Sequence, residues 1–316
     1  MAEYTINVDA NPSLQWNHVI EKEREPVLAL INEARSQIPA PVMWLGKLTR
    51  WAFPITGWRQ REIDGIADAL GVSRSDVALL QLSYELGQVA QSLYTLSTSP
   101  LGCTIGIGPT NEGMTHLRTL DWGLNSIRGA TRVVRYAKGG QNYYGVTILG
   151  FAGLLTGMVP GGYSVAINYA TPLALPTLNS GPAFLLRHVL ETCRTYEEAV
   201  QLIARSRISG AAFFSVCGVK PGQGAVIEHL GKHALIRRLD ESVGALAHAN
   251  HYVTHSWPGW PMDYTLERYS LMLRAMQNIK ELSRLKRVLS VHPVNNEITQ
   301  QRVILIPAEG YIELIG

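Results

Sequence analysis

Apolar residues recur at near-helical spacing through the first hundred positions, and the pattern then changes. This periodicity predicts helices over residues 16–38 and 61–70, and a third from Ser73 through about residue 93. Ser73 followed by Asp76 is a typical helix N-cap, because a serine oxygen accepts a hydrogen bond from a backbone N–H of the first turn. Pro26 lies inside the first segment and should end or kink that helix, because proline has no N–H to donate.

Beyond residue 102 the chain is rich in glycine, β-branched residues and short apolar runs, a texture typical of strands. Strands are predicted at 131–136, 144–149, 163–168, 212–219, 224–229, 234–239, 301–307 and 311–314. Helices are predicted at 183–193, after the capping box of Thr195 and Glu198, at 264–279 and near 281–289. Strand blocks flank a helical block, so the order indicates an α+β fold. The change in texture near residue 100 is the candidate boundary.

Composition excludes several classes of protein. The 316 residues are 46% hydrophobic and 17% charged, which is typical of a well-packed globule. The net charge is +3 and no run of Lys or Arg exceeds two, so no nucleic-acid partner is expected. The N-terminus lacks the basic and apolar regions of a signal peptide, and no apolar run reaches about 18 residues. We therefore expect a cytoplasmic protein, with peripheral contact between the protein and a membrane as an open alternative.

The three cysteines are few and widely spaced: Cys103, Cys193 and Cys217. This spacing argues against a disulfide framework and against a cysteine-based metal site, and we expect no metal or cofactor. Cys193 and Cys217 fit the ordinary interpretation of small buried hydrophobes. Cys103 differs because Gly102 precedes it, an apolar strand-like run follows it, and charged residues come soon after.

The Gly102–Cys103 peptide is a candidate for self-cleavage. Glycine leaves its carbonyl open to attack, so the Cys103 thiol would form a thioester that water hydrolyses. The new α-amine of Cys103 would have a pKa near 7.7–8.0 and would serve as general base for its own thiol. On this hypothesis residues 1–102 are a pro-segment and residues 103–316 are the catalytic part.

Arg118 and Asp121 are the candidate helpers of this thiol. Arg118 would favour the thiolate, and Asp121 would hold the new ammonium group. On a straight strand these two positions face opposite sides, so both reach one site only if a bulge or turn intervenes. The alternative is a structural ion pair or a pair of surface residues.

Several motifs in order along the chain resemble the cysteine-type N-terminal-nucleophile hydrolases, the family of N-acylethanolamine acid amidase and acid ceramidase. The matching segments are residues 6–16, 53–57, 80–85, 102–104, 117–121, 150–157, 249–252 with Arg268 downstream, and 290–294. The resemblance covers nearly the whole chain. It implies an αββα four-layer sandwich with a helical N-terminal pro-segment that stays bound to the catalytic part.

The resemblance also implies residue roles. Asn250 would donate a side-chain N–H to the oxyanion, Arg268 would support the site, and Asn168 is a candidate second oxyanion donor. The alternative for either asparagine is a turn or cap residue. The pro-segment contains no cysteine, so a disulfide between the two parts, as in acid ceramidase, is impossible. With no signal peptide evident, the chain looks like a bacterial relative.

The activity that the resemblance implies is hydrolysis of a linear amide of a fatty acid. Within the same chemistry, the alternatives are a bile-salt or penicillin V type acylase, or an acyltransferase that passes the acyl group to an amine. From another class, the alternative is a non-catalytic lipid-binding protein with the same fold.

Residues 39–54 are a candidate lipid-contact segment. Trp44, Leu48 and Trp51 share one helical face with Phe53 nearby, and the basic residues between them suit lipid headgroups. The alternative is a helix packed on the catalytic part. The aromatic loop at 255–261 is a candidate gate to an acyl pocket, or an ordinary packed surface loop.

Overall fold

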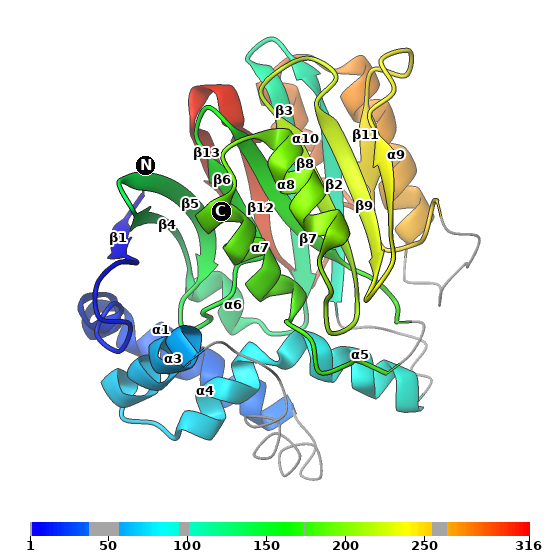
Figure 1. The fold of residues 1–316 in the computed structure, drawn as a ribbon. Coiled ribbons are helices and arrows are strands. Elements are labelled where there is room, and N and C mark those ends of the chain that lie inside the picture. The colour runs from blue at the N-terminus through cyan, green and yellow to red at the C-terminus, as the bar shows by residue number, and fades with distance from the viewer. Residues whose placement is uncertain (1, 38–56, 95–100, 173–174, 255–263) are drawn as a thin grey trace.

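Two β-sheets lie face to face and helices cover their outer faces, as the ribbon in Figure 1 shows. The computed structural model describes residues 2–37, 57–94, 101–172, 175–254 and 264–316. The larger sheet has eight strands in the order β1 (Tyr4–Asn7), β4 (Thr131–Lys138), β5 (Gln141–Ile148), β6 (Thr156–Val159), β7 (Tyr163–Tyr169), β8 (Ala211–Gly218), β9 (Gly224–Leu230) and β10 (Ala234–Arg238). The smaller sheet has five, in the order β11 (Leu246–His248), β2 (Leu101–Thr110), β3 (Gly113–Trp122), β12 (Thr299–Ile306) and β13 (Tyr311–Ile315).

The helical layers complete the sandwich. On the larger sheet lie α7 (Pro182–Thr192) and α8 (Tyr196–Arg205), and on the smaller sheet lies α9 (Thr265–Asn278), followed by α10 (Leu282–Val288). The short elements α6 (Ser126–Gly129) and η1 (Pro307–Glu309) connect strands. The four layers confirm the predicted αββα architecture.

The N-terminal region contributes α1 (Asn17–Gln37), α3 (Gly57–Leu70), α4 (Arg74–Gln81) and α5 (Ser83–Tyr94), which lie together at one end of the sheets (Figure 1). It also contributes β1, which pairs in parallel with β4 at the edge of the larger sheet. The sequence analysis missed this strand, because four residues are too few to show a period of two. Buried apolar residues from both sides of position 102 form one core cluster; they include Ile20, Leu30, Ile66, Val134, Leu149 and Ile167.

Local sequence signals explain most helix boundaries. The Ser73 hydroxyl accepts from the Asp76 N–H at 3.3 Å, and the capping box of Thr195 and Glu198 is present, so both predictions are confirmed. The first helix bends at Glu23, whose φ and ψ are −113° and 24°, one turn before Pro26. The prediction of a single helix from Ser73 through about residue 93 is wrong. This segment divides near Ser83, whose hydroxyl donates to the Leu80 carbonyl and so competes with the backbone ladder.

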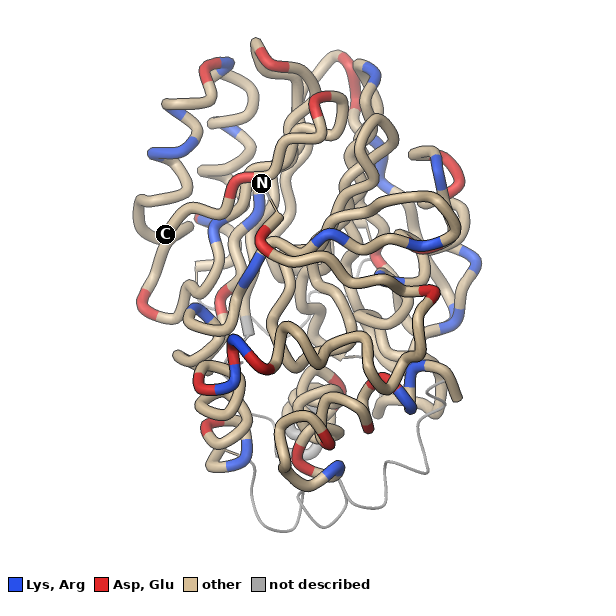
Figure 2. Tube along the Cα trace, turned by 90° about the vertical axis from the view of Figure 1, so that its left-hand side faces the viewer, with Lys and Arg blue, Asp and Glu red and all other residues tan. Residues whose placement is uncertain are grey.

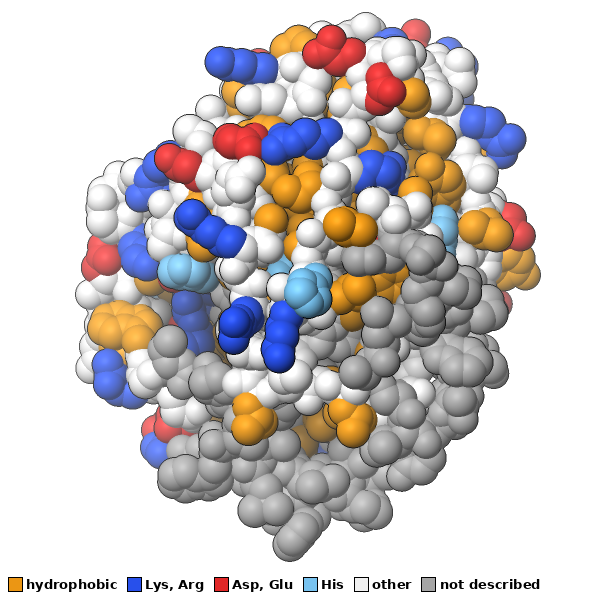
Figure 3. Space-filling model, turned by 45° about the vertical axis from the view of Figure 1, so that its right-hand side comes forward, with side chains coloured by type: hydrophobic (Ala, Val, Ile, Leu, Met, Phe, Trp, Pro, Cys, Tyr) orange, Lys and Arg blue, Asp and Glu red, His pale blue; other side chains and the backbone are white. Residues whose placement is uncertain are grey.

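The surface mixes chemical types. Charges of both signs are interspersed along the trace in Figure 2, and on the face in Figure 3 apolar side chains lie among Lys, Arg and His. No helix in the described part of the chain is long and apolar enough to cross a membrane.

Candidate active site

Cys103 lies near the start of β2, in a hairpin with β3. The two strands pair in regular antiparallel register, with Gly102 opposite Asp121 and Cys103 opposite Leu120. The Gly102–Cys103 peptide is therefore part of a β-ladder, and the structure fixes both residues of the candidate cleavage site. The thiol is buried, with 3% of Cys103 exposed.

Arg118 reaches this thiol from the same face of the sheet. Residues directly opposite on paired strands share a face, and Cys103 and Arg118 lie two positions apart along the hairpin. The Arg118 Nη2 is 3.7 Å from the Cys103 Sγ and donates to the Ile167 carbonyl at 3.0 Å. Its Nη1 donates to the Gln301 Oε1 at 3.4 Å, so the guanidinium is anchored on three sides.

Side chains, rather than a neighbouring strand, hold the backbone of Cys103. The last pair between β11 and β2 joins His248 to Ile105, so in the same register Asn250 falls opposite Cys103. The Asn250 Oδ1 accepts from the Cys103 N–H at 2.9 Å. Arg268 donates to the Cys103 carbonyl through Nη1 and to the Asn250 Oδ1 through Nη2, the latter at 2.8 Å.

Asp121 reaches the site from the other face of the hairpin. Its Oδ2 is 3.8 Å from the Arg268 Nη1, and its Oδ1 accepts from the Thr299 hydroxyl at 2.7 Å. A Cβ placed on Gly102 would lie 3.0 Å from the Asp121 Oδ2, so a larger residue would crowd this carboxylate.

No bulge lies between Arg118 and Asp121, so the two side chains lie on opposite faces of the hairpin, as expected of a straight strand. The pairing of β2 with β3 is regular, and the site has two sides: Arg118 lies by the thiol, and Asp121 lies by the Gly102 backbone. The register shift nearby is in β12, between Thr299 and Gln301.

The two candidate oxyanion donors are buried beside one another, and their amide nitrogens already have partners. The Asn250 Nδ2 donates to the Tyr169 carbonyl at 2.9 Å, and the Asn168 Nδ2 donates to the Ala249 carbonyl at 3.0 Å. Within the described residues the Asn168 Oδ1 has no hydrogen-bond partner. Asn168 therefore holds the backbone next to Asn250, and a donor role for either residue stays a prediction.

Burial controls the electrostatics of the thiol. It raises the pKa of Cys103 above its usual value, and the positive charge of Arg118 and a hydrogen bond from the Tyr169 N–H offset this only in part. Burial also raises the pKa of Asp121, although the Arg268 charge and the Thr299 hydroxyl favour its carboxylate. The raised pKa of Cys103 therefore favours the thiol over the thiolate.

The space beside the thiol is small and mostly apolar. The cavity volume is about 10 Å³, which is close to the least that holds one water molecule. Its lining consists of Tyr84, Gly102, Cys103, Arg118, Leu120, Trp122, Leu155, Ile167 and Tyr169.

Sequence reasoning missed several contributors to this site, among them Ile167, Gln301 and Thr299 described above. Tyr84 comes from α5, Tyr169 supplies a backbone carbonyl and N–H, and the Thr265 hydroxyl accepts from the Asn250 N–H at 2.9 Å. Nothing in the sequence marks them, because the packing of distant segments brings them together.

The remaining sequence predictions concern two further cysteines, the lipid-contact residues, the aromatic loop and metal binding. Cys193 and Cys217 are buried, as predicted, and form no disulfide. Trp44, Leu48, Trp51, Phe53 and the loop at 255–261 lie outside the described residues. Within the described ranges, no group of three or more His, Cys, Asp or Glu side chains is arranged to hold a metal ion.

Comparison with known proteins identifies similar chains. The family described as acyl-coenzyme A:6-aminopenicillanic acid acyl-transferase matches residues 123–297. The N-acylethanolamine-hydrolyzing acid amidase of Caenorhabditis elegans is 27% identical, with 96% of this chain and 88% of the relative covered. Acid ceramidase of Homo sapiens is 23% identical, with 98% and 84% covered.

A solved structure supports the fold. The Caenorhabditis elegans N-acylethanolamine-hydrolyzing acid amidase ortholog superimposes with a TM-score of 0.53 at 22% identity, covering 68% of this chain and 100% of that one.

Proposed function

The chain belongs to the acyl-coenzyme A:6-aminopenicillanic acid acyl-transferase family of N-terminal-nucleophile hydrolases and is an amide hydrolase, and from this premise we propose that it is a self-cleaving cysteine amidase. Its nucleophile is Cys103, and its substrates are linear amides of fatty acids. The non-catalytic alternative is set aside, because the relatives are named as amide-hydrolysing enzymes.

In the proposed maturation step, the Cys103 Sγ attacks the Gly102 carbonyl carbon. The peptide C–N bond breaks, the thiol proton passes to the departing nitrogen, and a thioester joins Gly102 to the sulfur. Water then hydrolyses this thioester, leaving a carboxylate on Gly102 and an α-amine on Cys103. Residues 1–102 become the pro-segment fragment and residues 103–316 the catalytic fragment.

In turnover, the new α-amine accepts the thiol proton while the sulfur attacks the amide carbonyl of the substrate. The amine returns that proton to the leaving nitrogen, and water releases the fatty acid from the second thioester. Arg118 favours the thiolate, and Arg268 and Asp121 hold the start of β2. Asn250 holds the α-amine and donates to the oxyanion.

The observation that carries this proposal is the way in which side chains hold the Cys103 backbone. A strand residue usually bonds to a neighbouring strand, whereas here Asn250 accepts from the N–H and Arg268 donates to the carbonyl. Such partners remain in place when the peptide breaks, so the new amine would be bound from the moment it forms.

Mass spectrometry of the purified protein tests the proposal. We expect two fragments divided between Gly102 and Cys103, and activity on fatty acyl amides. Cys103→Ala should give an intact, inactive chain, and Cys193→Ala, which removes a cysteine outside the site, should cleave and turn over normally. Two fragments from Cys103→Ala would mean that another protease cuts the chain, and would overturn self-cleavage.

The family description names an acyl transferase, which supports a second candidate activity. A thioester reacts with an amine as well as with water, so the two outcomes share one intermediate. Turnover of a fatty acyl amide with added ethanolamine measures the partition. Mostly fatty acid identifies a hydrolase, and mostly exchanged amide identifies a transferase.

Lipid access is a separate part of the proposal. Trp44, Leu48, Trp51 and Phe53 would contact a membrane or micelle surface and collect its amides, with the protein otherwise cytoplasmic. Trp44→Asp with Trp51→Asp should abolish binding to anionic vesicles and raise KM for long-chain amides, with short soluble amides unaffected. Equal loss on both substrates would mean that these residues support the fold instead.

A further inference from the structure

A second and much larger cavity shares no lining residue with the one beside Cys103. Its volume is about 460 Å³, within the range of about 300–1,000 Å³ typical of small-molecule sites. It lies where the start of α3 meets α7 and the end of β4. Trp58, Phe184 and Leu185 supply an apolar wall, and polar and charged side chains supply the rest.

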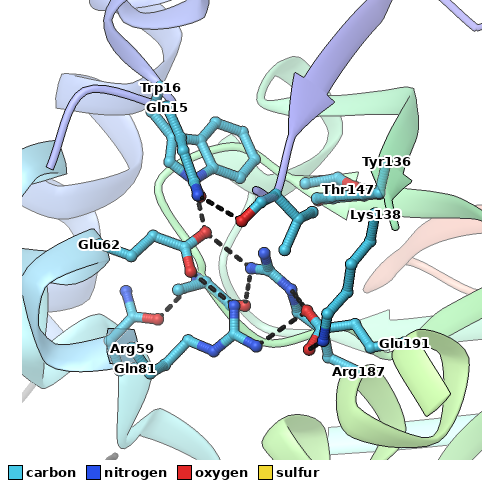
Figure 4. A network of polar contacts seen from close by, with 12 residues as sticks. Gln15, Trp16, Arg59, Glu62, Gln81, Tyr136, Lys138, Thr147, Arg187 and Glu191 are labelled. Atoms are coloured by element: carbon cyan, nitrogen blue, oxygen red, sulfur yellow. Dashed lines mark hydrogen bonds and ion pairs between the residues drawn. The ribbon is translucent and has the colours of Figure 1, made fainter. Parts of the chain in front are cut away.

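The charged wall belongs to an ion network that Figure 4 shows from close by. Two carboxylates, Glu62 and Glu191, meet three cations, Arg59, Lys138 and Arg187. Counted over these five residues, all in the described part of the chain, the network has one more cation than carboxylate.

The excess charge lies toward the cavity. Arg187 and Glu62 are sealed, with 0% of either side chain exposed, whereas 35% of the Lys138 side chain is exposed. The Lys138 Nζ is 3.1 Å from the Glu191 Oε2, which leaves its other protons for a second partner.

A further arginine and a histidine also line the cavity. Arg207 is exposed, and among the described residues it makes no hydrogen bond or ion pair through its side chain. His188 is exposed. Desolvation, Lys138 and Arg59 lower its pKa against the opposing charge of Glu191, which favours a neutral imidazole that donates one hydrogen bond.

We propose that this cavity binds an amphipathic monoanion, with a carboxylate or phosphate head between Lys138 and Arg207 and an apolar body against Trp58 and Phe184. The apolar wall disfavours a bare inorganic ion, because a hydrated ion gains nothing from contact with an indole or phenyl ring. The Glu191 carboxylate in the lining disfavours a multiply charged anion. A released fatty acid and an anionic phospholipid both carry the required chemistry.

The position of the cavity gives such a ligand a structural effect. Trp58 comes from residues 1–102, whereas Lys138, Phe184 and Arg207 come from residues 103–316. A bound ligand would join the two regions and stabilise the folded chain by mass action. The effect on fragment association rests on the proposed cleavage, but binding to the full chain does not.

Binding is tested on the full-length protein with octanoate, inorganic phosphate and phosphatidylglycerol vesicles, by calorimetry and by thermal unfolding. We expect saturable octanoate binding that raises Tm, with inorganic phosphate bound at least about tenfold more weakly. Arg207→Gln should weaken octanoate binding, and Lys138→Gln with Arg207→Gln should weaken it by about tenfold or more. Arg205→Gln, an exposed arginine of α8 outside the cavity, is the matched control.

The outcomes distinguish a lipid headgroup from a soluble amphiphile as the ligand, and binding in this cavity from activity at Cys103. Loss of vesicle binding alone in the double variant would identify a lipid headgroup as the source, and loss of octanoate binding would identify a soluble amphiphile. Unchanged binding of both probes by Arg207→Gln and by the double variant would overturn the proposal, and so would inorganic phosphate binding as tightly as octanoate. Amidase activity on a short amide, measured in parallel, reports separately on the proposed function.

Discussion

At the scale of single residues, the backbone of Cys103 belongs to a strand and is also held by two side chains. β11 stops at His248, and the Asn250 side chain takes the place that a strand backbone would otherwise fill. Arg268 binds both the Cys103 carbonyl and Asn250, so the three residues form one hydrogen-bonded unit. A change in any of them should therefore affect the others.

Asn250→Ala should lower kcat by about a hundred- to a thousand-fold with little change in KM, the usual effect of removing one oxyanion donor. Asn250→Asp separates the two roles of this side chain, because it keeps the acceptor for the Cys103 amine and loses the N–H donor. We expect Asp to be as poor as Ala in steady-state kinetics. An Asp variant with more than about a tenth of normal kcat would assign Asn250 to holding the amine alone.

Glu85 is a buried carboxyl close to the site. It follows Tyr84, which lines the Cys103 cavity, and it accepts from the Ser209 hydroxyl at 3.2 Å. A Cβ on Gly181 would lie 2.3 Å from the Glu85 Oε1, so α5 packs tightly against the chain there. Burial raises the pKa of Glu85 to about 7.

This pKa predicts a stability that depends on pH. The unfolded carboxyl titrates near 4.5, so between pH 4.5 and 7 the folded chain binds more protons and its stability falls as pH rises. A shift of this size corresponds to roughly 3 kcal/mol. Glu85→Gln should remove this loss, so the variant should be more stable than wild type at pH 8 and similar at pH 4.

Urea unfolding at several pH values measures the effect. Glu309→Gln, a change at an exposed carboxylate, should leave the pH dependence unchanged. A Glu85→Gln curve parallel to that of wild type would mean that Glu85 is solvated in the folded protein.

The sequence predicted which side chains gather around Cys103 better than how they are held there. Cys103 stood out because glycine precedes it and charged residues follow, and the structure places Arg118, Asp121, Asn250 and Arg268 around it. The hydrogen-bond partners of these side chains could not be recognised from the sequence. The Tyr169 carbonyl and the Thr265 hydroxyl belong to residues with no distinctive local pattern. They bind Asn250 only because distant elements pack together at that point.

At the scale of elements, the Glu62–Arg187 pair links the N-terminal helices to the part of the chain that follows residue 102. Glu62 lies on α3 and Arg187 on α7, 2.8 Å apart and fully buried. The Trp16 indole N–H also donates to the Glu62 Oε1 at 2.7 Å, and the Arg187 guanidinium lies over the Tyr136 ring. We infer that this contact keeps the two proposed fragments together after cleavage.

Arg187→Met should therefore cost about 3–5 kcal/mol of unfolding free energy, because it leaves two buried carboxylates short of a partner. In the cleaved protein it should also let the two fragments separate during gel filtration. Glu197→Ala removes a partner from the exposed Arg238–Glu197 pair and should cost less than about 1 kcal/mol. Similar small losses in both variants would show that Arg59 and Lys138 suffice to neutralise the network.

Helix caps and kinks were predictable, because the residues that determine them are neighbours in the sequence. Caps at Ser73 and Thr195 and the kink before Pro26 follow from chemistry within one turn of helix. β1, β6 and β11 were missed, because strands of three or four residues are defined by the neighbours with which they pair.

At the scale of the whole molecule, the pairing of distant segments could not be derived from periodicity. β3 pairs with β2, its hairpin neighbour, and also with β12, which lies some 180 residues further along the chain. Resemblance to a family supplied the four-layer arrangement that composition and spacing left open. The shared core then shows why residues 1–102 belong with the rest, since their apolar helix faces complete one cluster with the larger sheet.

The intact chain leaves little space beside Cys103, and together with the proposed cleavage this predicts when substrate binding begins. A cavity of about 10 Å³ beside Cys103 admits about one water molecule, whereas ligand sites occupy about 300 Å³ or more. Intact Cys103→Ala should therefore show no binding of a decanoyl amide by calorimetry, since the loss of one sulfur atom opens too little space. The same variant, cut by a specific protease at a recognition sequence replacing residues 95–100, should bind it. Tight binding by the intact chain would mean that opening the acyl site does not depend on breaking the bond at Cys103.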